Sequence, residues 1–179
     1  MENVVQIDGL NVFLLTKKLA EQHIDELLSL FRQIPQVEYT KEEVLAESKG
    51  ERIMYGKWEH SLVIIKDDKV IGIATGYERK SEENEQYPSS TLYFNELAIS
   101  PDMQKRGLGR KLVESFLQYN RNKGFLYLDG PFNFSVQTNA AEWNNHVQNL
   151  YKSLGFITRA TKNYDNRTDV IMGLNYKEV

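Results

Sequence analysis

The stretch TLYFNELAISPDMQKRGLGRKLVESFLQ, Thr91 to Gln118, places a strand, a glycine-containing loop and a helix in direct succession. Its first nine residues are rich in β-branched and aromatic side chains, and Pro101 closes the run. From Leu108 onward, apolar residues recur at helical spacing. The stretch therefore predicts a strand that leads through a short loop into an amphipathic helix.

The start of this helix carries an unexpected cluster of positive charge. A helix N-terminus is itself partly positive, so cations there are unfavourable. Gly107 and Gly109 allow a tight turn, and the first N–H groups of a helix can bind an anion. A bound polyanion would explain the cations, whereas the alternative is that the long side chains simply extend into water. The four cations are Lys105, Arg106, Arg110 and Lys111.

Composition limits the classes of function. The chain has 179 residues, and we expect a single domain over residues 1–179. A net charge of −3 argues against a general nucleic-acid binder, and the absence of cysteine excludes thiolate chemistry and zinc–thiolate sites. Neither a signal peptide nor an apolar run of about 20 residues is present, so we expect a cytoplasmic protein without membrane contact.

Periodicity and turn signals predict the other elements. The first half contains a strand within 11–19, a helix over 20–34, a helix opening with a capping-box pattern at Thr40, and a hairpin of 62–65 and 70–75. The second half contains a strand at 125–128, a helix beginning near Asn144, and strands at 156–164 and 169–176. This order predicts an α/β (α+β) fold with a mixed sheet. The strand at 93–99, its helix and the strand at 125–128 would form a βαβ-like unit, whose helix start lies where open sheets bind ligands.

The loop between this strand and this helix fits one of three known anion-binding motifs. The P-loop pattern is absent, and the dinucleotide fingerprint fails because Leu112 stands where its third glycine belongs. The remaining pattern, Gln104-Lys-Arg-Gly107-Leu-Gly109, resembles the Q/R-x-x-G-x-G/A motif of the GNAT superfamily of acyl-CoA-dependent N-acyltransferases. The strand ending ELAISP resembles the strand that precedes this motif in the family.

A second segment, NNHVQNLYKSLGF, resembles the later GNAT helix N-x-x-A-x-x-L-Y-x-x-x-G-F. Val147 departs from that pattern, since it replaces a small residue. The resemblance covers nearly the whole chain and is most specific from Tyr93 to Phe156. The matching residues are Asn144, Leu150, Tyr151, Gly155 and Phe156.

The resemblance implies a fold and a reaction. The fold would be a mixed, mostly antiparallel central sheet with helices on both faces. The reaction would move an acetyl group from acetyl-CoA to a primary amine of a small molecule or a peptide, by direct attack in a ternary complex and without a metal. A homodimer is possible in this family.

The resemblance also implies roles for individual residues. Tyr151 would be the general acid that protonates the leaving thiolate. Glu96 is the candidate base, although strand alternation places it on the opposite face from Asn95, where family bases often fall. Asn95 could instead hold a water that relays the proton, or a bulge could re-aim Glu96. The coenzyme would be held by Leu97, Ala98, Ile99, Gln104, Lys105, Arg106, Gly107, Leu108, Gly109, Arg110, Asn144 and Tyr151.

Some alternatives remain open at this point. A non-catalytic acyl-CoA-binding sensor or regulatory module would share the coenzyme site, and a longer acyl group could replace acetyl. The segment 131–143 holds Phe132, Phe134 and Trp143, which could wall an acceptor pocket or only pack on the surface. The three histidines, His23, His60 and His146, show no metal-ligand spacing.

Overall fold

The computed structural model describes residues 3–35, 37–79, 91–122 and 136–174. Its strands in chain order are β1 (Asn3–Ile7), β2 (Leu10–Leu14), β3 (Ser48–Lys49), β4 (Arg52–Ile53), β5 (Leu62–Lys66), β6 (Lys69–Arg79), β7 (Thr91–Ile99), β8 (Val136–Ala141), β9 (Ile157–Tyr164) and β10 (Arg167–Leu174). Its helices are α1 (Lys17–Gln22), α2 (Ile24–Phe31), α3 (Lys41–Leu45), α4 (Lys57–His60), the 3-10 turn Pro101–Met103, α5 (Leu108–Asn122) and α6 (Asn145–Ser153).

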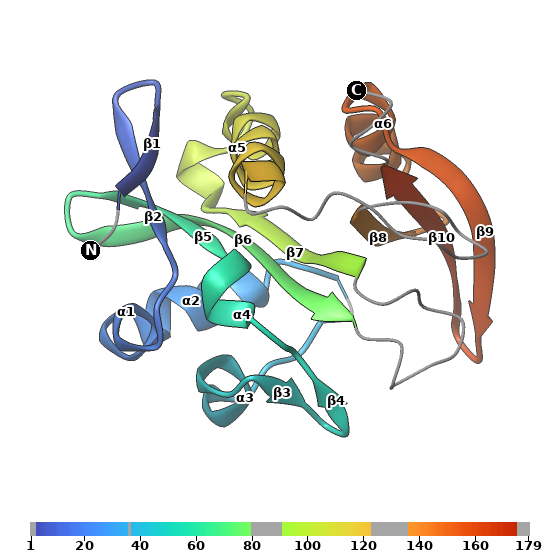
Figure 1. Cartoon of the computed structure of the whole chain (residues 1–179), viewed down its shortest axis with the longest axis horizontal. Helices are drawn as coiled ribbons and strands as arrows, with labels where there is room; N and C mark the ends of the chain where they lie inside the picture. The colour runs from blue at the N-terminus through green and yellow to red at the C-terminus, as the bar shows by residue number, and fades with distance from the viewer. Residues whose placement is uncertain (1–2, 36, 80–90, 123–135, 175–179) are drawn as a thin grey trace. The chain divides into compact units, whose positions relative to one another are not determined.

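The main sheet has the strand order β1-β2-β5-β6-β7-β8-β10-β9, and β3 pairs with β4 (Figure 1). The pairs β1–β2, β2–β5, β5–β6, β8–β10 and β9–β10 are antiparallel. Strands β7 and β8 run parallel. This confirms the predicted mixed, mostly antiparallel sheet with flanking helices.

The contacts divide the chain into two compact units. The first contains the described residues up to Tyr77 together with Glu96–Asn120, and the second contains those of 78–95 and from Arg121 onward. The boundary crosses β7 between Asn95 and Glu96. The units are described one at a time below.

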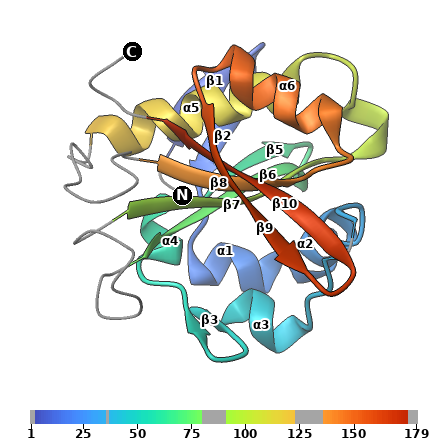
Figure 2. The ribbon, with the colours of Figure 1, turned by 90° about the vertical axis from the view of Figure 1, so that its right-hand side faces the viewer.

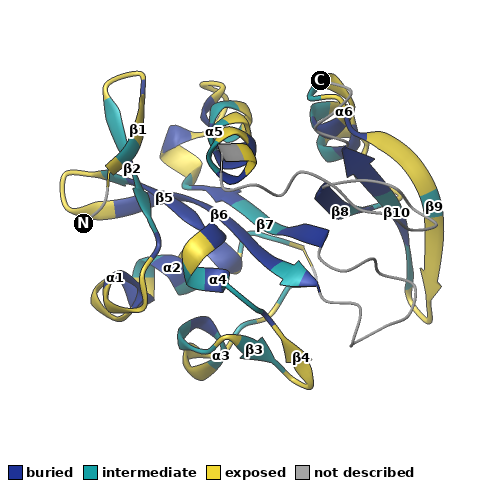
Figure 3. Ribbon diagram, in the orientation of Figure 1, coloured by how far each residue is buried: buried dark blue, intermediate teal, exposed yellow. Residues whose placement is uncertain are grey.

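In the first unit, helices cover both faces of the strands. Helices α1 and α2 lie on one face and α5 on the other (Figures 1 and 2). On the α1–α2 face, Leu27 and Phe31 pack with Val63 and Ile73 in a continuous apolar core. On α5, Leu112, Val113 and Phe116 are fully buried, as the periodicity of the sequence predicted. Figure 3 shows this distribution of buried residues along the strands and helices.

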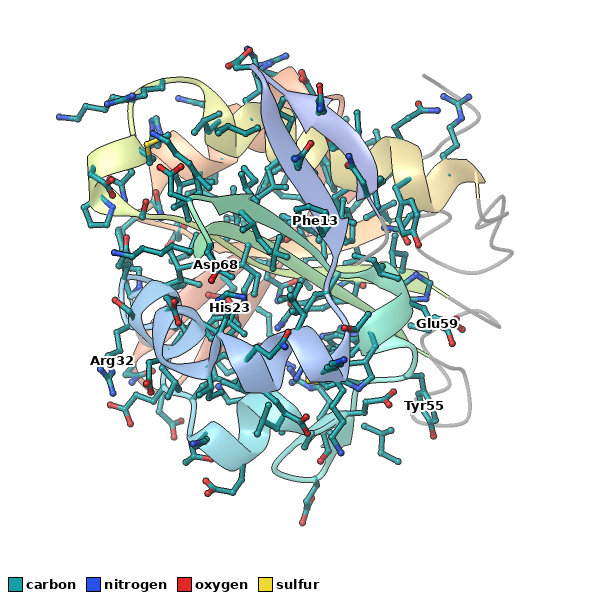
Figure 4. The ribbon with its side chains drawn as sticks, turned by 90° about the vertical axis from the view of Figure 1, so that its left-hand side faces the viewer. Phe13, His23, Arg32, Tyr55, Glu59 and Asp68 are labelled. Carbon is teal, nitrogen blue, oxygen red and sulfur yellow. The ribbon has the colours of Figure 1, made fainter. Side chains whose placement is uncertain are left out.

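The helix predicted over 20–34 is instead two helices, α1 and α2, that meet at His23 (Figure 4). The backbone of His23 leaves helical geometry, with φ −119° and ψ 30°, and its N–H donates to the Leu19 carbonyl. Both helices bury residues in the same core cluster, so the apolar periodicity continues across the break and does not reveal it.

The strand predicted within 11–19 is shorter than expected, since β2 ends at Leu14 and α1 begins at Lys17. It is preceded by β1, which was not predicted and which forms a tight hairpin with β2. The two residues between them, Asp8 and Gly9, have φ values of 50° and 79°. Positive φ at both positions matches the two-residue turns that suit the twist of a hairpin, and Asp-Gly is a strong signal for them. The predicted turn at Asp67 and Asp68 has the same character, with φ values of 49° and 58°.

In the second unit, the parallel partner of β7 differs from the prediction. The strand proposed at 125–128 lies outside the described residues. The observed partner is β8, Val136–Ala141, with Leu92 opposite Val136, and it falls inside the segment 131–143, for which the sequence predicted no strand. Its sequence, VQTNAA, is too polar to predict a strand from pattern alone. Its position between β7 and β10 nevertheless buries Gln137 and Thr138.

Candidate functional site

The loop that follows β7 is held in place by a glutamine side chain. Gln104 Nε2 donates to the Ile99 carbonyl at 2.9 Å and to Gln33 Oε1 at 3.2 Å. Met103, just before it, is buried. The loop then turns through two residues with left-handed backbone conformations, Lys105 at φ 59° and Gly107 at φ 76°. Gln104 therefore anchors the loop to the end of the strand.

The start of α5 presents backbone N–H groups beside this loop. The first N–H of the helical ladder is that of Lys111, which donates to the Gly107 carbonyl at 3.1 Å. The N–H groups of residues 108–110 come before that ladder, at the positive pole of the helix. Left-handed residues within a turn aim successive N–H groups toward a common point, which is how backbone concavities bind anions.

Gly109 brings this helix start close to β7. A Cβ built on Gly109 would lie 3.7 Å from Ile99 Cγ1 and 3.9 Å from Leu97 Cδ2. Leu97 and Ile99 therefore face α5, whereas Ala98 belongs to the core on the α1–α2 face. This confirms the prediction that Leu97 and Ile99 lie on one face of β7 and Ala98 on the other.

The four cations of the sequence separate into two pairs. Arg110 forms an ion pair with Glu114, Nε to Oε1 at 2.9 Å, and Lys111 forms one with Asp8 of the β1–β2 turn. Lys105 and Arg106 are exposed, and neither pairs with a carboxylate in the part of the chain that the structure describes. Of the four cations, the two that are not paired with a carboxylate among the described residues therefore lie in the loop just ahead of α5.

The middle of β7 is the least covered part of that strand. Asn95, Glu96 and Leu97 are half-buried, whereas residues 91–94 and 98–99 are buried. The Glu96 N–H donates to Thr75 Oγ1 at 3.0 Å. The Glu96 carboxylate accepts from the Tyr39 hydroxyl at 3.4 Å. Since Tyr39 packs against the core of the α1–α2 face, Glu96 keeps the face that alternation predicted for it.

Tyr151 belongs to the second unit and lies on α6. It is buried at 4% exposure, and its ring meets that of Phe94 edge-on, with centroids 5.9 Å apart. The ring of Phe156 packs beside it at 5.5 Å. The helix ends as predicted, with Gly155 at φ 91° and the Phe156 N–H donating to the Tyr151 carbonyl.

Asn144 is the N-cap of α6, and its Oδ1 accepts from the Val147 N–H at 3.2 Å. One polar atom of Asn144 is thus engaged in starting the helix. Trp143, next to it, is 57% exposed. Phe132 and Phe134, which the sequence grouped with Trp143, lie outside the described residues.

The predicted site residues thus fall into two sets. The first unit holds Glu96, Leu97, Ala98, Ile99 and the loop 104–110, which the structure brings together at the end of β7 and the start of α5. The second unit holds Asn95, Asn144 and Tyr151. Asn95 of the second set and Glu96 of the first are consecutive residues in the chain.

Four residues near these sets were not identified from the sequence: Asp8, Gln33, Tyr39 and Thr75. Each makes its contact through the tertiary fold, and Tyr39 and Glu96 are 57 positions apart. Only Asp8 had a usable local signal, the Asp-Gly turn, although that signal predicts a hairpin and not an ion pair.

The described residues show no sign of a metal site or of a membrane-spanning helix. No group of three or more histidine, cysteine, aspartate or glutamate side chains there could hold a metal ion. His60 is buried and its Nδ1 lies 2.7 Å from Asn120 Oδ1, as expected for a core residue. No helix among the described residues has the length and apolar character needed to cross a membrane.

Comparison with solved structures identifies the fold. The NatC complex bound to Gag peptide and CoA contains a chain with a TM-score of 0.70 and 14% identity, covering 93% of this chain and 98% of that one. The ribosomal-protein-S18-alanine N-acetyltransferase from Escherichia coli has a TM-score of 0.65 and 16% identity, covering 92% of each chain. Arabidopsis thaliana Naa50, in complex with the bisubstrate analogue CoA-Ac-MVNAL, has a TM-score of 0.63 and 13% identity, covering 93% of this chain and 99% of that one.

At these identities the structural likeness shows a shared fold. No curated protein sequence matches the chain. A sequence model of the Acetyltransferase (GNAT) family, however, matches residues 24–156, which is most of the chain and includes the loop, Glu96 and Tyr151. The chain therefore belongs to the GNAT acetyltransferase family and is an acyltransferase.

Proposed function

We propose that this protein transfers an acetyl group from acetyl-CoA to a primary amine of a small molecule or a peptide. The observation that carries the proposal is the loop ahead of α5, where left-handed residues, the helix pole and two cations without a carboxylate partner among the described residues meet. A pyrophosphate supplies the negative charge that this arrangement lacks, because helix N-termini favour phosphate groups.

The residues of the loop fit that ligand in different ways. Gly107 and Gly109 carry no side chain that would keep a phosphate from the backbone. Residues 105–110 would contribute N–H groups, and Lys105 and Arg106 would add charge. Gln104 shapes the loop through its bond to Ile99, so its contribution to coenzyme binding is indirect. Leu97, Ala98 and Ile99 would offer backbone groups to the pantetheine arm, and Asn144 would contact it from α6.

Acetyl transfer then requires a series of proton and charge movements. The acceptor ammonium loses a proton to Glu96, or to an ordered water held by Asn95, and the neutral amine attacks the thioester carbon. The main-chain N–H near Leu97 stabilises the oxygen as it gains charge. The C–S bond breaks, and Tyr151 donates its phenolic proton to the leaving thiolate, since a phenol is protonated at neutral pH. The attacking nitrogen then loses its second proton to give the amide, and that proton restores the phenol of Tyr151.

Two observations support this assignment of roles. Residues 95–97 are half-buried, whereas residues 91–94 and 98–99 of the same strand are buried, so Glu96 lies in the least covered part of β7. Tyr151 is buried, and the rings of Phe94 and Phe156 pack against its ring and hold it in place.

Structures of the same fold suggest which acceptors to test first. One of them is bound to a peptide, and another to an analogue built from the pentapeptide MVNAL. A free peptide N-terminus is therefore the first acceptor class, and small polyamines are the second.

The proposal is tested by thiol release from acetyl-CoA in the presence of the MVNAL peptide, spermidine and an aminoglycoside. At least one amine should stimulate release, and its acetylated product should appear by mass spectrometry. Tight binding of acetyl-CoA without stimulation by any amine would favour a non-catalytic acyl-CoA-binding module. Competition with longer acyl-CoAs tests the acyl preference.

Replacing Tyr151 by Phe tests the general acid. We expect turnover to fall by about 10²-fold, because general acid catalysis typically contributes that much. The dissociation constant for acetyl-CoA, measured by calorimetry, should stay within about twofold. Tyr164→Phe makes the same chemical change at an exposed tyrosine and should leave turnover unchanged. A loss of affinity with unchanged turnover in Tyr151→Phe would contradict the acid role.

The cytoplasmic location, the single domain over residues 1–179 and the possible homodimer remain predictions.

A further inference from the structure

Tyr39 lies outside the predicted site, and its hydroxyl contacts the carboxylate of the candidate base. It lies in the link between α2 and α3, and its hydroxyl is 3.4 Å from Glu96 Oε1. This distance is long for a hydrogen bond. Hydrogen bonds of catalytic groups are often long without substrate and shorten when it binds.

The ring of Tyr39 is held by two neighbours. It packs on the ring of Phe31, with centroids 4.5 Å apart and planes inclined by 32°. The Lys49 ammonium lies 3.7 Å from the centre of the Tyr39 ring and also donates to the Glu38 carbonyl at 2.7 Å. Phe31 is a buried member of the first unit's core, so it gives the ring a rigid support. A cation over an aromatic face is attractive and further restricts the ring.

Glu96 is held from the backbone side as well. Its N–H donates to Thr75 Oγ1 at 3.0 Å, and Thr75 is 2% exposed. The backbone of Glu96 is thus attached to a buried side chain, while its carboxylate is contacted by Tyr39.

We propose that Tyr39 is a positioning residue that orients the Glu96 carboxylate toward the acceptor amine. The inference rests on the role of Glu96 in the proposed function. Tyr39 acts through Glu96, by limiting the rotation of the Glu96 side chain. Because a misplaced catalytic group loses much of its effect, the loss of a single hydroxyl should reduce turnover.

The test is a double-mutant cycle of Tyr39→Phe and Glu96→Gln. The Phe variant keeps the ring and its contacts with Phe31 and Lys49, and it removes only the hydroxyl. Turnover is measured with acetyl-CoA and the MVNAL peptide, or spermidine where that is the faster acceptor. Tyr164→Phe is the matched control, and thermal unfolding shows that each variant is folded.

We expect Tyr39→Phe to lower kcat about 3- to 10-fold in the wild-type background, which corresponds to the loss of one ordinary hydrogen bond and suits a contact of 3.4 Å. In the Glu96→Gln background the same substitution should change kcat less than twofold. The dissociation constant of acetyl-CoA should not change. A structural role for Tyr39 would instead reduce activity by the same factor in both backgrounds.

The outcomes separate this inference from the function on which it rests. If Glu96→Gln impairs turnover and Tyr39→Phe does not, the positioning role is wrong and the base assignment stands. Equal losses in both backgrounds also overturn the positioning role. If Glu96→Gln leaves turnover unchanged, the base assignment itself fails, and the inference fails with it. The absence of any acetylated amine would contradict the proposed function as a whole.

Discussion

Gly107 shows how much one residue contributes to the candidate coenzyme loop. Its φ of 76° lies in the left-handed region, which costs roughly 1–2 kcal/mol for a residue with a Cβ. No atom lies within 4 Å of the position that a Cβ would take, so the requirement for glycine comes from the backbone and not from crowding. Gly109 differs, because it lies in the first turn of α5 and is not among the positive-φ residues.

These two glycines give a matched pair of variants. Gly107→Ala should lower the free energy of unfolding by about 1 kcal/mol. It should also weaken acetyl-CoA binding, since relaxing the strain moves the loop N–H groups. Gly109→Ala should not destabilise the fold, because alanine favours a helix by about 0.5–1 kcal/mol over glycine. Urea unfolding and calorimetry measure the two effects, and equal destabilisation by both variants would contradict this account.

Helix α3 illustrates, at the scale of one element, how a very short helix is stabilised by its ends. At five residues it is too short to be stable alone. At its start, Thr40 Oγ1 accepts from the Glu43 N–H, and Glu43 Oε2 accepts from the Thr40 N–H, as the capping-box pattern predicted. At its end, the buried Lys57 ammonium donates to the carbonyls of Glu43, Val44 and Ala46 at 3.2, 2.7 and 2.7 Å. Three ammonium donors thus meet three carbonyls that the helix cannot pair.

The free energy of unfolding should depend on pH because the amine of Lys57 is buried. Burial lowers the pKa of Lys57 to about 8, partly opposed by the charge of Glu47. Between pH 8 and the unfolded value of 10.5, the unfolded chain binds the proton more tightly, so the contribution of Lys57 to stability should rise with pH. Below pH 8 Lys57 is protonated in both the folded and the unfolded chain, so the free-energy cost of burying its charge is fully present.

Lys57→Met serves as the reference for that measurement. At pH 7 it should cost about 1–3 kcal/mol, because carbonyls are left without a donor. The difference in unfolding free energy between wild type and variant should then grow between pH 8 and 10, with a slope of at most about 1.4 kcal/mol per pH unit. A difference that stays flat with pH would show that the pKa of Lys57 is not lowered.

The start of α5 is the second element whose behaviour can be predicted. Arg110 and Lys111 already have carboxylate partners, whereas the charges of Lys105 and Arg106 remain for a ligand. Acetyl-CoA binding should therefore weaken several-fold as NaCl rises from about 0.1 to 1 M, where the screening length falls from about 10 to 3 Å.

A matched pair of double variants tests which cations are responsible. Replacing Lys105 and Arg106 by Ala should weaken binding and flatten its salt dependence. Replacing Lys17 and Lys18 removes two adjacent exposed lysines at the start of α1, on the other face of the strands. This change should alter neither the affinity for acetyl-CoA nor its salt dependence. Equal effects of the two double variants would mean that only net charge matters.

At the scale of the whole molecule, coenzyme binding should stabilise the native state. A ligand present at 100 times its dissociation constant adds about 2.7 kcal/mol when it binds only the folded protein. For a chain of this length that corresponds to a rise in Tm of about 5–10 °C. Thermal unfolding with and without acetyl-CoA measures the shift. The Lys105/Arg106 double variant should shift less at the same concentration, and no shift for wild type would contradict coenzyme binding.

Features of the chain that depend on neighbouring residues were predicted well from the sequence. The strand, loop and helix of 91–118, the turn at Asp67–Asp68, the capping box at Thr40 and the end of α6 at Gly155 all formed as expected. Each depends on backbone conformation, hydrogen bonds or periodicity within a few positions. The chain's membership in the GNAT family could be inferred for the same reason, because its motifs are local.

The sequence by itself thus determined the glycine loop, the charged helix start and the helix that carries Tyr151. Only the tertiary structure decided that β8 is the strand beside β7, that Lys111 is paired with Asp8, and that Tyr39 reaches Glu96. The partners in the last two contacts are 103 and 57 positions apart. No periodicity or turn signal encodes such a pairing, because it arises only when strands and links that are distant in the chain pack on the same core.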